Sequence, residues 1–196
     1  MAVVMARGAS SRMGTPKGMV VLPDDSRPML ARVVDLYLEL DIPIVVVARW
    51  DTASIYGKIL GESQAVEMVS AEPGGGTART LAIAWEMFQN RCSHLWAHPV
   101  DLPMVRASTL ERLSGFSLAE PEMVIRPTHL STPGHPVILP SKALGKLAES
   151  QKFSEFEGDM KELLAAAGPA GKGLELEEVE VSDPGVIRDF DTMHIE

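Results

Sequence analysis

The sequence predicts an α/β fold in which a mostly parallel sheet is flanked by helices. Residues 42–48 form an unbroken apolar run, which is typical of a central parallel strand covered on both faces. Short apolar runs also alternate with longer amphipathic stretches through at least the first half of the chain, which indicates right-handed βαβ units. The chain has 196 residues without a linker, repeat or low-complexity tract. We therefore expect a single domain over residues 1–196.

The individual elements follow from apolar spacing and from the positions of Gly and Pro. Besides 42–48, the expected strands are 1–5, 65–70, 93–98, 123–126, 136–139 and a more polar strand at 174–181. The expected helices are 28–40, a helix ending near Gly61, a helix entered after Gly74-Gly75-Gly76, and 106–113, 141–148 and 155–167. Asp51 and Thr77 stand where side chains that cap the second and third helices are expected.

Composition excludes several classes of protein. The formal net charge of −9 argues against general binding to nucleic acid or to a membrane surface, because both need a basic face. The longest apolar runs are too short to cross a bilayer, and the N-terminus does not resemble a signal peptide. A single cysteine, Cys92, forms neither an internal disulfide nor a cysteine-based zinc site. We expect a cytoplasmic protein.

The loop after the first strand carries the most informative motif, which reads Gly8-Ala9-Ser10-Ser11-Arg12-Met13-Gly14-Thr15-Pro16-Lys17. Its glycines permit turns and a close ligand approach, and its backbone N–H groups can bind phosphate oxygens. Arg12 can donate two hydrogen bonds to a phosphate, and Lys17 adds a point charge. The loop lacks the Gly-Lys-Ser/Thr of a Walker A motif and the glycine spacing of a dinucleotide-binding fingerprint.

Two later loops also directly follow expected strands, at 70–77 and at 99–103. Ligands of open α/β sheets bind beyond the carboxyl ends of the strands, so we expect these loops to lie along one edge with the first loop. Asp101 lies in the third loop and is a candidate magnesium ligand, because Mg²⁺ prefers oxygen ligands and commonly takes one or two carboxylates together with phosphates and water. The competing interpretation of Asp101 is a carboxylate that stabilises its own loop.

The first loop and three later segments together resemble the signature of the MobA/MocA-like nucleotidyltransferases. The molybdenum cofactor cytidylyltransferase branch is the closer match. The later segments are Pro99-Val100-Asp101-Leu102-Pro103, Gly134-His135-Pro136-Val137 and Asp189-Phe190-Asp191-Thr192. Two departures stand out: Arg7 occupies a position where the family has Ala or Gly, and Gly76-Thr77-Ala78-Arg79-Thr80-Leu81 replaces a Gly-Met-Ser-Ser-Ser-Leu type of run. Arg7 could contact phosphate or could obstruct the base.

The resemblance implies a Rossmann-like nucleotidyltransferase fold and a magnesium-dependent enzyme that releases pyrophosphate. CTP is expected to donate the nucleoside monophosphate, and molybdopterin is expected to be the phosphorylated acceptor. A molybdoenzyme would be a possible recipient of the product. By the same resemblance, the catalytic groups would be Arg12, Lys17 and Asp101. The metal ligands would be Asp101 and Asp191. The nucleotide-binding residues would be Ala6, Gly8, Ser10, Arg12, Lys17, Gly76, Thr77 and Asp101. His135 would contact the acceptor.

Some alternatives stay open at this point. Asp191 could be merely solvated, with Asp189 competing for its role, and His135 could instead satisfy a backbone group. His98 is more simply explained as a packed histidine at a strand end. The acceptor could be a sugar 1-phosphate or another phosphorylated small molecule. A non-catalytic nucleotide-binding protein that takes part in cofactor delivery is an alternative from a different class.

Overall fold

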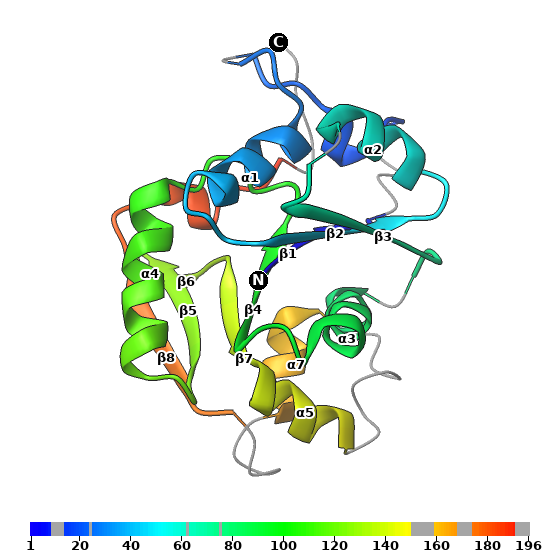
Figure 1. Ribbon diagram of the computed structural model, residues 1–196. Helices are drawn as coiled ribbons and strands as arrows, with labels where there is room; N and C mark the ends of the chain where they lie inside the picture. Colours follow the sequence, from blue (N-terminus) through cyan, green and yellow to red (C-terminus); the bar gives the residue numbers. More distant parts are fainter. Residues whose placement is uncertain are drawn as a thin grey trace.

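The computed structural model describes residues 1–8, 14–23, 25–61, 63–74, 76–149, 159–167 and 174–190. Figure 1 shows a central twisted sheet with helices packed on both of its faces. The predicted α/β class with a mostly parallel sheet is confirmed. Within the described residues, no helix is both long enough and apolar enough to cross a membrane.

The sheet contains eight strands in the described part of the chain, in the order β3-β2-β1-β4-β7-β5-β6, and β8 pairs with β5. The strands are β1 (Ala2–Ala6), β2 (Ile44–Arg49), β3 (Val66–Ala71), β4 (His94–Pro99), β5 (Val124–His129), β6 (Thr132–Pro133), β7 (Val137–Pro140) and β8 (Leu176–Glu180). The β3-β2-β1-β4 half is parallel throughout. β7 runs antiparallel between β4 and β5, whereas β8 is parallel to β5.

Helices cover both faces. They are α1 (Met29–Leu38), α2 (Ala53–Leu60), α3 (Gly76–Phe88), α4 (Ala107–Ala119), α5 (Ser141–Glu149) and α7 (Met160–Ala167), with short 3-10 turns η1 (Lys17–Met19) and η3 (Pro184–Val186). In Figure 1, α1 and α2 lie on one side of the sheet, and α3, α5 and α7 lie on the other.

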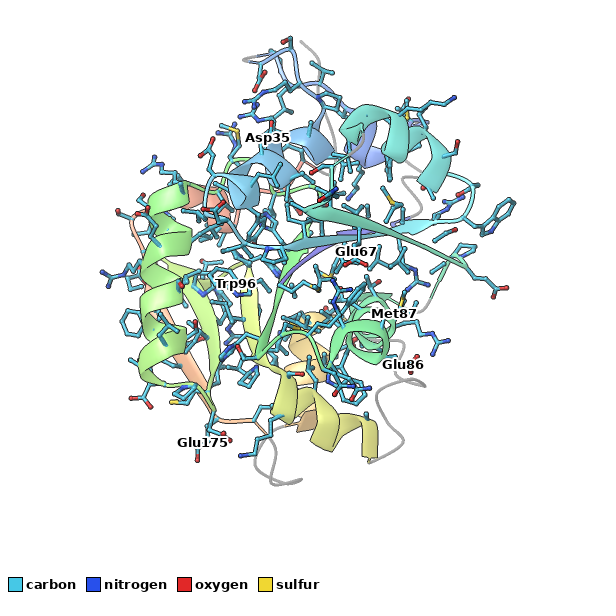
Figure 2. The ribbon with its side chains drawn as sticks, viewed as in Figure 1. Asp35, Glu67, Glu86, Met87, Trp96 and Glu175 are labelled. Atoms are coloured by element: carbon cyan, nitrogen blue, oxygen red, sulfur yellow. The ribbon has the colours of Figure 1, made fainter. Side chains whose placement is uncertain are left out.

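Two apolar cores follow from this layering, because alternate residues of each strand point to opposite faces. Val4, Val46 and Trp96 pack with α1 and α4, whereas Val3, Val45 and Leu95 pack with α3, α5 and α7. Figure 2 shows Trp96 inside the first of these layers, and Glu86 and Met87 on the side of α3 that faces away from the sheet. Strands that are apolar on both sides are what a doubly covered sheet requires.

Most expected elements are present, but both predicted helix caps are wrong. Asp51 accepts hydrogen bonds from the Arg49 guanidinium, at 2.9 Å from its Nε, and α2 begins after Thr52 without a side-chain cap. A charged partner competes more strongly for the carboxylate than a backbone N–H does. α3 begins at Gly76, whose φ of +59° suits glycine, so Thr77 lies inside the first turn of the helix rather than at its cap.

Other elements differ in extent. α4 continues to Ala119, beyond the predicted end at residue 113, because Leu113 and Ser117 continue its buried face. The short strand β6 was not predicted, since two residues carry no periodicity. The first part of the helix predicted at 155–167 lies outside the described residues.

The C-terminal segment, residues 181–190, packs against the start of α4 and the loop after β4. The buried Asp183 carboxylate accepts hydrogen bonds from Arg106 N at 2.8 Å, Thr109 Oγ1 at 2.7 Å and Gly185 N at 2.9 Å. Asp183 therefore satisfies backbone donors both at the start of α4 and in η3. These contacts hold the segment leading to Phe190 against the edge of the sheet at which β4 ends.

Candidate active site

A pocket of about 340 Å³ lies at the carboxyl ends of β1, β3 and β4. Its walls come from all three loops that the sequence predicted to share one edge. The lining residues are Met5, Ala6, Arg7, Gly8, Lys17, Tyr56, Pro73, Gly74, Gly76, Thr77, Thr80, Pro99, Val100 and Asp101. A concave site with apolar walls and a few charged groups is typical of a small-molecule pocket.

The predicted site residues divide into three groups. Ala6, Gly8, Lys17, Gly76, Thr77 and Asp101 line this pocket. His135 lines a second pocket. Ser10, Arg12 and Asp191 lie outside the described residues.

An ion pair joins the first and third loops inside the pocket. Lys17 Nζ lies 2.6 Å from Asp101 Oδ2, and the two side chains are 20% and 18% exposed. The contact brings together residues that are 84 positions apart in the chain. A cation at hydrogen-bonding distance on one carboxylate oxygen shows that Asp101 faces the pocket, where it can equally accept a metal ion.

The loop after β3 is held by Arg7. Its Nη2 donates to Gly74 O at 2.6 Å and to Glu72 O, and its Nη1 donates to Thr80 Oγ1 at 3.1 Å. Arg7 is only 8% exposed, and burial, followed by the nearby charge of Arg79, lowers its pKa. An arginine remains protonated at neutral pH even so, and the buried guanidinium is compensated by carbonyl and hydroxyl acceptors.

The C-terminal segment reaches the aspartate loop through the backbone. Phe190 N donates to Asp101 O at 3.1 Å, and the Phe190 ring packs against the small cluster formed by Val20, Leu22 and Met29. The residue after Phe190 in the chain is Asp191. Among the described residues, no group of three or more His, Cys, Asp or Glu side chains is placed to hold a metal ion.

His135 lines the second pocket, which has a volume of about 550 Å³. Burial lowers its pKa, while a backbone hydrogen bond and the charges of Asp101 and Asp159 oppose that shift. Its Nδ1 lies 3.4 Å from Ala97 O, so the side chain does satisfy a backbone group. Arg126 and Lys161 line the same pocket next to apolar side chains, and the Arg126 guanidinium is paired with the Glu178 carboxylate.

His98 has a structural role. It is fully buried, its Nε2 lies 3.0 Å from Leu102 O and its Nδ1 lies 2.9 Å from the Tyr37 hydroxyl. Because a carbonyl oxygen only accepts, Nε2 carries the proton and Nδ1 accepts from Tyr37. Burial lowers the pKa of His98 to about 4, so the ring is neutral at pH 7.

Sequence reasoning missed two pocket residues with polar side chains, Tyr56 and Thr80. Thr80 follows Gly76 by four positions, so the helical period would have placed both on one face of α3. Tyr56 lies on α2, and its hydroxyl accepts from Gly18 N at 3.3 Å. Nothing in its local sequence pattern indicates that contact, which depends on how α2 packs beside η1.

Comparison with known families places this site in context. The model of the MobA-like NTP transferase domain matches residues 2–170. The chain belongs to this family. Comparison with curated protein sequences gives no significant match. Membership identifies the pocket at the carboxyl edge as part of a nucleotidyltransferase domain.

Solved structures support the fold of this MobA-like domain. Rv0371c from Mycobacterium tuberculosis has a TM-score of 0.71 at 19% identity, over 97% of this chain and 91% of that one. Molybdopterin-guanine dinucleotide biosynthesis protein A from Archaeoglobus fulgidus has a TM-score of 0.66 at 17% identity, over 91% and 82%. A 4-diphosphocytidyl-2C-methyl-D-erythritol synthase from Anaerococcus prevotii has a TM-score of 0.76 at 13% identity, over 97% and 91%.

Proposed function

We propose that this nucleotidyltransferase transfers a nucleoside monophosphate from a nucleoside triphosphate, with CTP as the expected donor, to phosphorylated molybdopterin. The observation that carries the proposal is the Lys17–Asp101 pair inside a pocket built by the three strand-end loops. The family match supports the transferase class. The order of the Asp101, His135 and Asp191 segments along the chain supports the molybdenum cofactor branch.

Catalysis would rest on electrostatics and positioning. The triphosphate would draw Lys17 away from Asp101, and Arg12 and Lys17 would then hold the phosphate oxygens. Asp101 and Asp191 would hold Mg²⁺, which supplies positive charge to those oxygens. A solved neighbour, Rv0371c, was crystallised as a complex with manganese, which is consistent with a divalent ion in this fold.

The chemical step needs no general base from the protein. A phosphate group of the acceptor is already anionic at neutral pH, and its oxygen would attack the α-phosphorus as the bond to the β-phosphate breaks. Pyrophosphate leaves with both bonding electrons. The groups in this chain would have to orient the acceptor and stabilise the added charge.

We assign the acceptor to the second pocket, beside His135. That pocket combines the cations Arg126 and Lys161 with the apolar side chains of Met160, Leu164 and Leu176, which suits a phosphorylated molecule with a large ring system. β7 begins beside the end of β4, because Val137 is opposite Ala97, so His135 lies at the edge of the sheet that also carries the Asp101 loop. Substitution of the exposed Lys161 by Ala should raise the KM for the acceptor and leave NTP binding unchanged.

Thermal unfolding with Mg²⁺ and each of CTP, GTP, ATP and UTP tests the donor. A ligand at about a hundred times its Kd should stabilise the fold by roughly 2.7 kcal/mol, a shift on the order of 5–10 °C. Pyrophosphate release is then measured with molybdopterin and, in parallel, with sugar 1-phosphates. If pyrophosphate is released only with a sugar 1-phosphate, that compound would replace molybdopterin as the proposed acceptor. Nucleotide binding without turnover on any acceptor would favour the non-catalytic alternative.

A further inference from the structure

The loop between β3 and α3 forms one wall of the nucleotide pocket and is rich in glycine. Pro73, Gly74, Gly76 and Thr77 line the pocket, and Gly74 adopts a φ of +95°. Glycine has the largest backbone freedom of any residue, so a glycine-rich wall is costly to order. An ordered wall therefore needs an anchor outside its own sequence.

Arg7 is that anchor. Its guanidinium donates to two main-chain carbonyls of the loop, those of Glu72 and Gly74. It also donates to Thr80 Oγ1, which in turn donates to Gly76 O at 3.0 Å. A single buried side chain thus joins the end of β1 to the loop and to the first turn of α3.

The planar guanidinium is suited to this task. Five N–H donors in a fixed plane can reach several acceptors at once, whereas a lysine offers one nitrogen on a flexible stem. The carbonyls of Glu72 and Gly74 point to Arg7, so they are engaged before any ligand arrives. The pocket wall is then ordered in advance, and a ligand that contacts it does not have to order the loop.

We propose that Arg7 is a positioning residue that holds residues 72–77 as a preformed wall of the nucleotide pocket and thereby sets nucleotide affinity and base selectivity. The proposal rests on the proposed function of the pocket. In the ligand-free pocket the Arg7 guanidinium donates to Glu72 O, Gly74 O and Thr80 Oγ1, so it binds the protein's own loop and helix. Arg7 would act on binding, and the reacting phosphates would remain with Lys17 and Asp101.

The main experiment compares wild type with Arg7→Ala. The apparent Kd equals the intrinsic Kd divided by the fraction of molecules whose loop is in place, so we expect Kd and KM for the NTP to rise about tenfold or more if that fraction falls to about a tenth. The kcat at saturating NTP should change by less than about threefold, because the reacting groups are untouched. The differences in Kd and KM among CTP, GTP, ATP and UTP should become smaller. Guanidinium ion at low millimolar concentration should partly restore the KM.

Two milder variants guard against a folding defect in Arg7→Ala. Thr80→Val removes one of the contacts and should shift KM in the same direction by a smaller factor, and Arg7→Lys should recover only part of the affinity. Arg91→Ala is the matched control, because Arg91 pairs with Glu67 beyond the end of α3 and is remote from the pocket. It should leave KM, kcat and selectivity at wild-type values.

Hydrogen exchange gives a readout that does not depend on nucleotide. The amides of Glu72, Gly74, Gly76 and Thr77 should exchange faster in unliganded Arg7→Ala than in wild type, and those of β2 should not. Unchanged exchange together with an unchanged KM in Arg7→Ala would overturn the proposal, as would a loss of kcat at constant KM. If wild type binds no nucleotide, the proposed function fails, while the exchange comparison still decides whether Arg7 holds the loop.

Discussion

Lys17 Nζ is 2.6 Å from Asp101 Oδ2, so the candidate phosphate-binding cation and the candidate metal-binding carboxylate neutralise each other in the ligand-free pocket. Each side chain is about four-fifths buried, which strengthens their attraction relative to an exposed pair. In the proposed mechanism the triphosphate would replace Asp101 as the partner of Lys17, and the metal ion would replace Lys17 as the partner of Asp101. Each new partner would be a stronger one, and the two would arrive together. The pair thus keeps both groups oriented until the substrate separates them.

The first prediction concerns Asp101. Asp101→Asn should reduce kcat at least about a hundredfold, because the amide retains the shape of the side chain but loses the charge that binds the metal. Pyrophosphate release at saturating NTP and Mg²⁺ measures this. Asp51→Asn is the matched control: Asp51 follows the end of β2 and pairs with Arg49, but it is not among the lining residues of the pocket. Wild-type turnover in Asp101→Asn would refute the metal assignment.

The second prediction concerns Arg12. Arg12→Ala should weaken binding of the NTP more than that of the matching monophosphate, because its guanidinium is proposed to hold the triphosphate. Titration calorimetry with the two ligands gives the ratio of the affinities. An equal loss for both ligands would contradict that assignment and would move Arg12 to the α-phosphate or the ribose.

The third prediction is a pH dependence of stability that arises from His98. Its folded-state pKa of about 4 lies below the ordinary value of 6.5, so the unfolded chain takes up the proton first. Stability from this residue is complete above about pH 6.5 and is lost as the pH falls toward 4, by about 3 kcal/mol in all. Urea unfolding between pH 4.5 and 7.5 should show this loss.

His98→Gln provides the comparison, because an amide can keep the hydrogen bond to Leu102 O but does not titrate in this range. The variant should lose less stability than wild type over the same interval. Burial also lowers the pKa of His94 and His135, so a smaller dependence should remain. Identical slopes in wild type and variant would show that His98 is not the responsible group.

The fourth prediction concerns Asp183, which is 3% exposed and accepts from Arg106 N, Thr109 Oγ1 and Gly185 N. Asp183→Ala would leave buried donors without an acceptor and should lower the free energy of unfolding by about 2–4 kcal/mol. Chemical denaturation measures the loss. Asp35→Ala removes an exposed partner of Arg27 and should change stability by less than about 1 kcal/mol. Similar losses in both variants would rule out a special role for Asp183.

The sequence predicts the fold well because its strongest signals are the physical causes of that fold. The apolar runs that became β1, β2 and β4 are buried on both faces, and their periodicity reports this directly. The predicted meeting of three loops at one edge follows from parallel strands, whose carboxyl ends share an edge. The single-domain organisation and the cytoplasmic location stay predictions.

The details of the site were less predictable because they depend on contacts between distant segments. No local pattern indicates that Arg7 binds carbonyls 65 and 67 positions away, or that Lys17 meets Asp101. The cap assignments failed for local reasons: Asp51 had a competing partner in Arg49, two residues before it, and Gly76 allowed α3 to begin early. The roles assigned to Ser10, Arg12 and Asp191 lie outside the described residues and stay predictions.

Strand β8 has a consequence for the behaviour of the protein in concentrated solution. In the described part of the chain it pairs with β5 alone, so no described strand covers its other side. Its sequence, Leu-Glu-Glu-Val-Glu, follows Glu175, which Figure 2 shows where the chain enters this strand. A second copy approaching this border would bring two rows of glutamates together, and their repulsion opposes edge-to-edge aggregation. The acidic stretch that contributes to the net charge therefore protects the open border of the sheet from self-association.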